Sequence, residues 1–392
     1  MDMTPLVAPY TGYVYPNEMI IAWNLLIVIY PYLTGLVAGA FTVSSFYHVF
    51  GMERFKPVAR LALLTSLSCM IFVPSPLLLH LGHPERALNS MLTPKFTSAF
   101  AMFGIFASFY VCVLMLECWF AFRVDNVARA KNYEGLIRSF YRAVTLWSDD
   151  VSTKARSYDR KWLLSLAIIG IPAAHGLHLY VGFVFGSLKA REWWGSDMMP
   201  AIFLFSAVVS GLALVIVLYV FVSKIRREPI DQACLKGMTY ALWGFLMFAL
   251  LLEGLEFSAL VYKGKEGIDA IMEYVNGPLK YRFFVGQLAI GSFVPIALMG
   301  IMIARGTSGR PFVIGVTISA LLVLISVFLM RWNVVIGGQE ISKSLKGLLT
   351  YQPELHGPHG ILAGIGVMTA PFALLWALTR IFPPWDSPPT RA

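Results

Sequence analysis

The chain has 392 residues, of which 57% are hydrophobic and only 14% are charged. Soluble domains carry about 25% charged residues, so this composition excludes an ordinary soluble protein. The net charge of +9 does not indicate nucleic-acid binding, because the basic residues gather in particular loops between apolar runs, which is a pattern of membrane topology.

Nine apolar runs are long enough to cross the hydrocarbon core, which takes roughly 20 residues of helix. None of them alternates apolar with polar residues, so helices are expected rather than barrel strands. We therefore predict an all-α integral membrane protein, a single polytopic membrane domain over residues 1–392 with about nine transmembrane helices (8–10). The runs cover residues 20–49, 57–81, 97–122, 162–187, 198–222, 235–262, 282–304, 312–336 and 356–382.

The basic residues predict how the chain is oriented. Under a nine-span arrangement, 20 of the 31 Lys and Arg lie on one side, nine of them between Arg123 and Lys161. Because cytoplasmic loops are enriched in Lys and Arg, the N-terminus is expected outside and the C-terminus in the cytoplasm. The first 16 residues lack the basic region of a cleavable signal, so the first span should remain as an anchor in the cytoplasmic (inner) membrane.

The long loop over residues 123–161 is expected to be cytoplasmic. Apolar residues recur in it at helical spacing from Tyr133 to Trp147, interleaved with Arg138 and Arg142. This pattern predicts an amphipathic helix in the lipid headgroup plane, and a helix that docks a partner is the alternative. Pro74 and Pro76 should distort the second span before its outer end.

Two carboxylic acids stand out in the sixth span. This span should end near Tyr262, so Glu256 and Glu253 lie about 9 and 14 Å below its outer end and share one helix face. Two carboxylates this close in a low dielectric cannot easily both ionise, which suits a proton acceptor beside a quinol hydroxyl. Hydrogen bonds that only serve helix packing are the alternative.

The fourth span places His175 and His178 on one face of its outer half, with Tyr180 nearby. His178 is expected near the depth of Glu253 and is the preferred partner of the two acids. In the first span, Asn24 could donate to a quinone carbonyl. The sequence thus predicts a catalytic set of Glu253, Glu256 and His178 around one pocket near the outer face.

Two outer loops carry further candidates for binding a cofactor. The second span ends in HLGHPERA over residues 80–87, with His83 and Arg86, and the ninth begins at HGPHG over 356–360, with His359. Solvation at the surface is the competing explanation for these residues. Glu117 in the third span could begin a proton route from inside, but snorkelling to the interface is favoured; Arg331 in the eighth is expected to snorkel or to pair with a glutamate.

The sequence gives no sign of a metal ligand set. Cys69, Cys112, Cys118 and Cys234 show no C-x-x-C spacing, so iron–sulfur or zinc ligation by this chain is not expected. Paired axial histidines at the spacing of membrane dihaem cytochromes are absent from every span, although one haem bridging the fourth and ninth spans stays open.

Three segments resemble the polysulfide reductase membrane subunit (NrfD/PsrC) family. They are YPYLTGLVAGAF over residues 30–41, HLGHPERA over 80–87 followed by TPKFTS over 93–98, and HLYVG over 178–182 followed by MPAIFLFSA over 199–207. The resemblance covers about residues 20–215. The family often has Asp before its Leu-Gly-x-Pro element, where this chain has His80. Within the family, the chain most resembles the DsrP/HmeB-type subunits of Dsr/Hme complexes of sulfur metabolism.

The resemblance implies NrfD-like helical bundles and a quinone-binding membrane anchor without haem or cluster. Such subunits bind menaquinone or ubiquinone as an exchangeable cofactor near the outer face. They exchange electrons with an extracytoplasmic ferredoxin-like subunit carrying [4Fe–4S] clusters. Larger complexes add a multihaem cytochrome c and further membrane and cytoplasmic subunits.

Three other functions remain open from the sequence. A proton-coupled secondary transporter would use the same buried acids but predicts paired repeats with broken helices. A b-type cytochrome anchor would use the histidines as haem ligands. A purely structural anchor would leave the buried glutamates without a purpose.

Overall fold

The computed structural model describes residues 10–98, 100–264 and 266–385. The first nine residues, on which the expectation of an uncleaved N-terminus partly rests, lie outside the described residues. So does Arg391, one of the basic residues counted for the topology.

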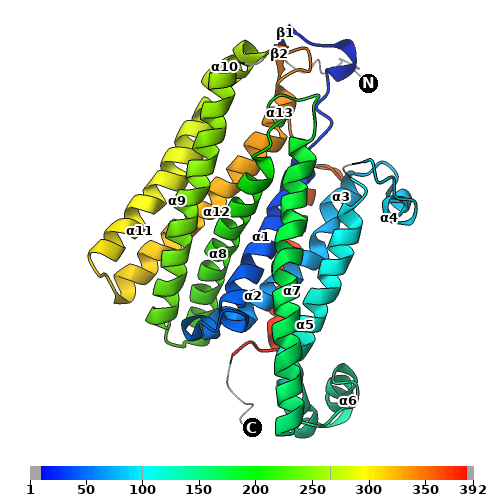
Figure 1. The fold of residues 1–392 in the computed structure, drawn as a ribbon, viewed down its shortest axis with the longest axis vertical. Coiled ribbons are helices and arrows are strands. Elements are labelled where there is room, and N and C mark those ends of the chain that lie inside the picture. The colour runs from blue at the N-terminus through cyan, green and yellow to red at the C-terminus, as the bar shows by residue number, and fades with distance from the viewer. Residues whose placement is uncertain (1–9, 99, 265, 386–392) are drawn as a thin grey trace.

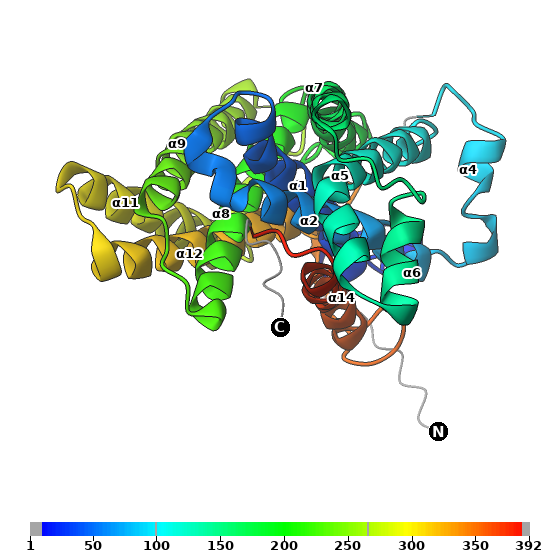
Figure 2. The same cartoon turned by 90° about the horizontal axis from the view of Figure 1, so that it is seen from below.

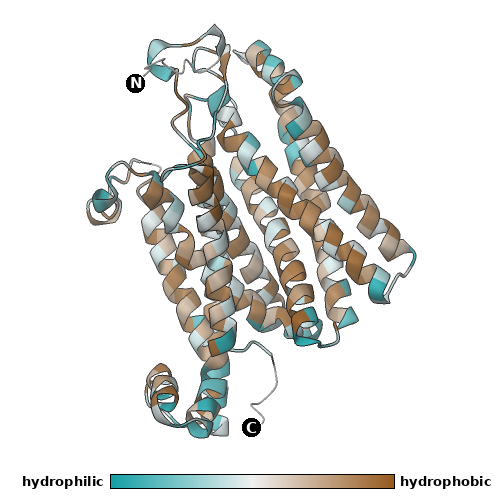
Figure 3. Ribbon diagram, turned by 180° about the vertical axis from the view of Figure 1, so that it is seen from behind, coloured by the Kyte–Doolittle hydropathy of each residue, from teal (hydrophilic) through white to brown (hydrophobic). Residues whose placement is uncertain are grey.

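Within the described residues, nine helices are long and apolar enough to span a membrane. Figure 3 shows hydrophobic residues along the length of the helix bundle and hydrophilic residues mainly near its two ends. The predicted all-α multi-pass membrane fold is confirmed. The spans are α1 (Leu25–His48), α2 with α3 (Lys56–Phe72, Pro74–His80), α5 (Phe103–Asn132), α7 (Thr153–Gly186), α8 (Met199–Arg226), α9 (Gln232–Lys263), η4 with α11 (Tyr281–Phe293, Val294–Ala304), α12 (Gly309–Val335) and α14 (Ile361–Ile381).

The spans run alternately between two ends of the molecule (Figure 1). One end, here called the strand end, carries β1 (Tyr10–Tyr13), β2 (Lys346–Leu349), α10 (Ile268–Asn276) and α13 (Gly337–Glu340). The opposite end, called the α6 end, carries α6 (Gly135–Val144). Short elements complete the fold: η1 (Pro16–Glu18), η2 (Glu53–Phe55), η3 (Pro84–Arg86) and α4 (Asn89–Leu92).

Helices α1 and α8 form the centre of the bundle. Seen from below, α2, α5, α7 and α14 lie around one side of this centre, and α9, α11 and α12 lie on the other (Figure 2). The two central helices approach closely because Gly39 faces Gly211: a Cβ on Gly39 would overlap the Ala207 carbonyl oxygen and lie 2.7 Å from the Gly211 Cα. Small residues permit such crossings in membranes, where van der Waals packing holds helices together.

Two local features follow from the sequence. The second span breaks at Val73, so that α3 begins at Pro74, as the two prolines predict. A helix, α6, forms in the predicted loop as expected, but the loop is shorter than 123–161, because α5 continues to Asn132 and α7 begins at Thr153. Trp119 of α5 donates from Nε1 to the Val144 carbonyl at 2.7 Å. The position of α6 in the headgroup plane stays a prediction.

Polar contacts tie the strand end together. The strands β1 and β2 pair antiparallel, with Tyr10 opposite Leu349. The buried Glu18 carboxylate forms an ion pair with Arg191 at 2.7 Å and accepts from the Ser342 hydroxyl at 3.0 Å. Arg191 also donates to the Ile341 carbonyl at 2.6 Å. These contacts fix the N-terminal segment and the loop before α8 against the end of α12.

Candidate functional site

A cavity of about 430 Å³, here called the lateral cavity, lies among the strand-end halves of α8, α9, η4 and α12. Both sixth-span acids line it: Glu253, and Glu256 one turn nearer the strand end. Most of the remaining lining residues are apolar, although Glu192, Asp197 and Lys263 also line the cavity. Its apolar residues include Met198, Ile202, Phe257, Phe283, Met330 and Val334.

Two carboxamides connect Glu253 to the next two helices of the cavity. Asn333 of α12 donates from Nδ2 to Gln287 Oε1 at 2.8 Å, and Gln287 of η4 donates from Nε2 to Glu253 Oε2 at 2.8 Å. The Asn333 Oδ1 atom is buried and has no hydrogen-bond partner among the described residues. This series of hydrogen bonds therefore ends at Asn333, whose side-chain oxygen has no described partner and which is itself a residue that lines the cavity.

An unusual helix presents Gln287 to this cavity. Tyr281–Phe293 is a π-helix, a wide form that is rare and frequently occurs at functional sites. The Gln287 carbonyl accepts from the hydroxyls of Ser292 and Ser326 at 2.9 and 3.0 Å. Sequence reasoning missed Gln287 and Asn333, although isolated carboxamides inside apolar spans were a usable signal.

His178 does not line the lateral cavity. It is fully buried between α7, α8 and α12, where Arg331 donates from Nη2 to His178 Nε2 at 3.1 Å. The expected convergence of His178 with the two acids on one pocket is therefore not what the structure has. Arg331 and Glu253 are nevertheless close enough for their charges to interact.

The snorkelling expected of Arg331 is wrong. Its side chain is 0% exposed; it lies 3.8 Å over the ring of Phe203 and donates to the Ser206 hydroxyl at 2.7 Å and to the Phe203 carbonyl at 3.2 Å. Packing of α12 against α8 holds it inside because the side chain points across the bundle, not along the helix toward water. The ion pairs of the described residues include none between Arg331 and a glutamate.

The other two candidates of the fourth span lie apart from the lateral cavity. His175 bridges α7 and α1, with Nε2 3.0 Å from the Thr42 hydroxyl and Nδ1 2.7 Å from the Ile171 carbonyl. Tyr180 packs against Phe106 of α5. His175 thus has partners for both ring nitrogens within the bundle.

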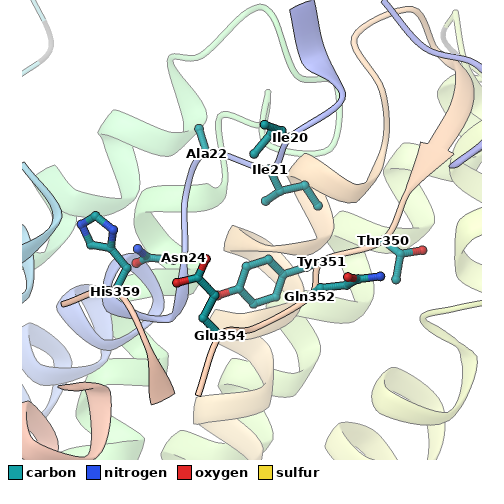
Figure 4. Close-up of a pocket in the computed structure, with 9 residues that line it drawn as sticks. All are labelled: Ile20, Ile21, Ala22, Asn24, Thr350, Tyr351, Gln352, Glu354 and His359. Carbon is teal, nitrogen blue, oxygen red and sulfur yellow. The ribbon is translucent and has the colours of Figure 1, made fainter. Parts of the chain in front are cut away.

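A second cavity of about 340 Å³, the strand-end cavity, brings together Asn24 and His359 (Figure 4). Asn24 caps α1 by accepting from the Leu26 amide at 3.0 Å, and His359 Nε2 lies 3.0 Å from the Leu79 carbonyl. Tyr351 and Glu354 also line this cavity. Burial raises the pKa of the Tyr351 phenol, and its oxygen accepts from the Leu25 amide at 3.2 Å.

The remaining predicted contacts lie at the surface. His83 and Arg86 are both exposed on the loop after α3, where His83 Nδ1 lies 2.9 Å from Glu85 Oε1. Neither residue lines the lateral or the strand-end cavity. In the described part of the chain, no group of three or more His, Cys, Asp or Glu could hold a metal ion.

The two cavities differ in what they could bind. The lateral cavity combines apolar walls with Glu253, Glu256 and two carboxamides inside the spans and with Glu192, Asp197 and Lys263 toward the strand end, which suits the polar end of an apolar molecule. The strand-end cavity is formed largely by loop residues beside the extramembrane strands, which suits a polar or water-soluble group.

Comparisons with known proteins agree with this fold. The chain is similar to a selenate reductase subunit of Mesobacillus selenatarsenatis, with 30% identity over 92% of this chain and 86% of the relative. It is 24% identical to protein NrfD of Escherichia coli over 81% of this chain and 95% of the relative. It is 22% identical to the Hdr-like menaquinol oxidoreductase integral membrane subunit of Archaeoglobus fulgidus, over 60% of this chain and 52% of the relative.

The model of one protein family matches most of the chain. It is described as polysulphide reductase, NrfD, and matches residues 14–342, a range that holds all nine spans except the last. The resemblance seen in the three sequence segments is confirmed: this multi-pass membrane protein belongs to the NrfD family of polysulphide reductase membrane subunits.

Proposed function

We propose that this chain is the quinone-binding membrane anchor of a multi-subunit respiratory electron-transfer complex, and that the lateral cavity receives the quinone headgroup. The observation that carries the proposal is the pair of hydrogen bonds that joins Glu253, Gln287 and Asn333 beside this cavity, with Gln287 presented by a π-helix. Relatives named as a reductase subunit and as a menaquinol oxidoreductase membrane subunit support it.

The residues of the cavity fit such a ligand. A quinol, when bound, supplies two electrons and two protons. Glu253 and Glu256 are the acids of the sixth span that line the cavity and are placed to take up the protons. The apolar wall would hold the ring system and exclude water, which strengthens electrostatic interactions in the cavity.

His178 and Arg331 would affect Glu253 without lining the lateral cavity themselves. Arg331 is a buried cation whose charge interacts with Glu253, and His178 holds one of its guanidinium nitrogens. We therefore assign His178 the role of a positioning residue for Arg331. Asn24 and His359, which line the strand-end cavity, are proposed as contacts for a second quinone headgroup, and His175 and Tyr180 of α7 remain candidates for the same role.

The partners follow from this role. The acceptor or donor of the electrons would be an extracytoplasmic ferredoxin-like subunit with [4Fe–4S] clusters at the strand end, joined by a multihaem cytochrome c and further membrane and cytoplasmic subunits. In this proposal the strand end faces outside and the α6 end faces the cytoplasm, as the distribution of Lys and Arg predicts. Menaquinone and ubiquinone both fit the cavity chemistry, and the electrons could pass in either direction.

The test is quinol-linked turnover of the intact purified complex. Glu253→Gln and Glu256→Gln should each lower turnover by roughly 10²-fold or more, because a positioned proton acceptor contributes 10²–10⁴-fold. Assembly, followed by co-purification of the partner subunits, should be unchanged. Glu85→Gln, which alters an exposed acid outside both cavities, is the matched control and should keep the wild-type rate. Wild-type turnover in both cavity variants would refute the assignment.

A further inference from the structure

Glu117 of α5 is a carboxylic acid buried inside the bundle, away from both cavities. Its side chain is 1% exposed, and neither carboxyl oxygen has a hydrogen-bond partner among the described residues. The snorkelling favoured for it on sequence grounds is therefore wrong, because the side chain is sealed inside the bundle. A carboxyl group in hydrocarbon without partners is so costly when charged that it takes up a proton instead.

The surroundings of Glu117 form a polar column between α5 and α2. One turn toward the α6 end, the Ala121 carbonyl accepts from Arg60 of α2 at 2.9 Å. Two turns toward the strand end, the Tyr110 hydroxyl lies 3.0 Å from the Ser66 hydroxyl of α2. Residues 110, 117 and 121 share one helix face, so Glu117 lies between these two contacts.

The column reaches water at the α6 end. Arg60 forms an ion pair with Asp125 of α5 at 2.7 Å, and these side chains are 24% and 39% exposed. Glu117 is only two turns of helix from Asp125, about 12 Å along the axis. His48 of α1, whose Nε2 is buried without a partner among the described residues, carries a further titratable group close enough to interact with Arg60.

Toward the strand end the column continues as hydroxyl groups. Ser66 also donates to the Val37 carbonyl of α1 at 3.0 Å. Tyr110 and Cys118 are titratable neighbours of Glu117 on its own helix. Within the part of the chain that the structure describes, neither carboxyl oxygen of Glu117 has a hydrogen-bond partner, so no neighbouring group fixes its proton. The partly exposed Arg60–Asp125 pair is the ionic contact through which a proton from the α6 end would approach it.

We propose that Glu117 is a proton-exchange site, reached through the Arg60–Asp125 pair from the α6 end, opposite to the lateral cavity. The step is a reversible transfer: a hydronium ion gives its proton to the Glu117 carboxylate, forming the neutral acid and one water. Such a site supplies or stores a proton on the far side of the membrane from the redox cavity. The inference rests on α5 and α2 alone and does not need a quinone to occupy the lateral cavity.

Infrared spectroscopy of the purified complex tests the exchange directly. A protonated carboxyl gives a C=O band that shifts when D₂O replaces H₂O. The wild type should show such a band for Glu117, which disappears in Glu117→Gln and persists in Glu117→Asp. Glu253→Gln, the matched control in the other half of the molecule, should leave it in place. A spectrum unchanged by Glu117→Gln, or a band that does not shift in D₂O, would overturn the proposal.

Asp125→Asn tests the route to the site. This variant should slow the shift of the Glu117 band in D₂O by several-fold, whereas Glu85→Gln, at the strand end, should not. An unchanged exchange rate in Asp125→Asn would overturn the route through the α6 end.

A vesicle experiment separates this inference from the proposed function. In vesicles containing the complex, proton uptake from the compartment facing the α6 end, followed with a pH-sensitive dye, should fall at least several-fold in Glu117→Gln while quinol turnover stays within about twofold. Equal uptake in wild type and variant would overturn the inference. A wild-type complex without quinol turnover would instead contradict the proposed function, and the infrared exchange would still report on Glu117.

Discussion

The seam between α1 and α8 and the lateral cavity bury polar groups in opposite ways. Thr34 and Ser45 of α1 bond to their own helix, Thr34 to the Tyr30 carbonyl and Ser45 to the Phe41 carbonyl, each at 3.0 Å. Around the lateral cavity, Glu253 is bonded across helices by Gln287. A bond to another helix marks a candidate site here only beside a cavity, because Thr42 of α1 also contacts His175 of α7 although neither residue lines the lateral or the strand-end cavity.

Packing differs between the two regions as well. The seam leaves no room for a side chain at Gly39 or Gly211, whereas the cavity needs a widened helix to present its carboxamide. The close contact between α1 and α8 gives the bundle a rigid centre, whereas the outer helices α9 and η4 leave room for the lateral cavity. Stability should thus be concentrated at the seam and turnover at the cavity.

Of the variants that test this comparison, Gly39→Leu should have the largest effect, a loss of stability at the contact between α1 and α8. The new side chain would collide with the backbone of Ala207 and Gly211, and overpacking costs about 1–3 kcal/mol or more. We expect a lower thermal midpoint of the purified complex and less protein in the membrane. Gly244→Leu on α9, where a Cβ meets nothing within 4 Å, is the control and should be tolerated. Equal losses in the two variants would contradict a rigid seam.

Arg331→Met should lower both stability and turnover. The change leaves His178 Nε2, the Phe203 carbonyl and the Ser206 hydroxyl without the Arg331 donor, and each unsatisfied buried polar group costs about 1–3 kcal/mol, so the thermal midpoint should fall. Quinol turnover should fall by about tenfold or more, because Glu253 loses the nearby positive charge. Thermal denaturation and turnover are measured on the same preparation. A drop in stability with unchanged turnover would make Arg331 a packing residue only.

Much of the fold was predictable, because hydrophobicity along the chain determines where helices cross a membrane. The nine spans, the break at Pro74 and the shared face of Glu253 and Glu256 all follow from spacing. What failed were positions that depend on which neighbouring helix a side chain meets. Arg331 and Glu117 were expected at the interface by their depth, but packing against α8 and α2 keeps both inside.

The site was predictable only in part for the same reason. Periodicity predicts similar depths for His178 and Glu253, but it cannot tell that His178 contacts Arg331 and does not line the lateral cavity. The π-helix also has no periodic signature, since the apolar run continues through it, and Gln287 was therefore overlooked. Asn24 and His359 do meet, at a cavity other than the one that holds the two acids.

Ser326→Ala should have a moderate effect through the π-helix. Ser326 donates to the Gln287 carbonyl at 3.0 Å, and the loss of one such bond costs about 1 kcal/mol. We expect a small fall in thermal midpoint and a few-fold loss of turnover as Gln287 shifts. Ser319→Ala on the same helix removes a buried hydroxyl that has no described partner, so it should be neutral or slightly stabilising. The same response in both variants would remove the π-helix from the site.

The smallest change is expected from His359→Ala in the strand-end cavity. His359 contacts the Leu79 carbonyl and lines the strand-end cavity, not the lateral cavity that holds the two acids, so turnover should stay within about twofold if the headgroup binds in the lateral cavity. Tyr351→Phe, which removes the hydroxyl that accepts from the Leu25 amide at 3.2 Å, should behave alike. Steady-state turnover at varied quinol concentration checks both. If His359→Ala and Tyr351→Phe abolish turnover while Glu256→Gln does not, the headgroup binds in the strand-end cavity, and Glu253 and Glu256 only transfer protons.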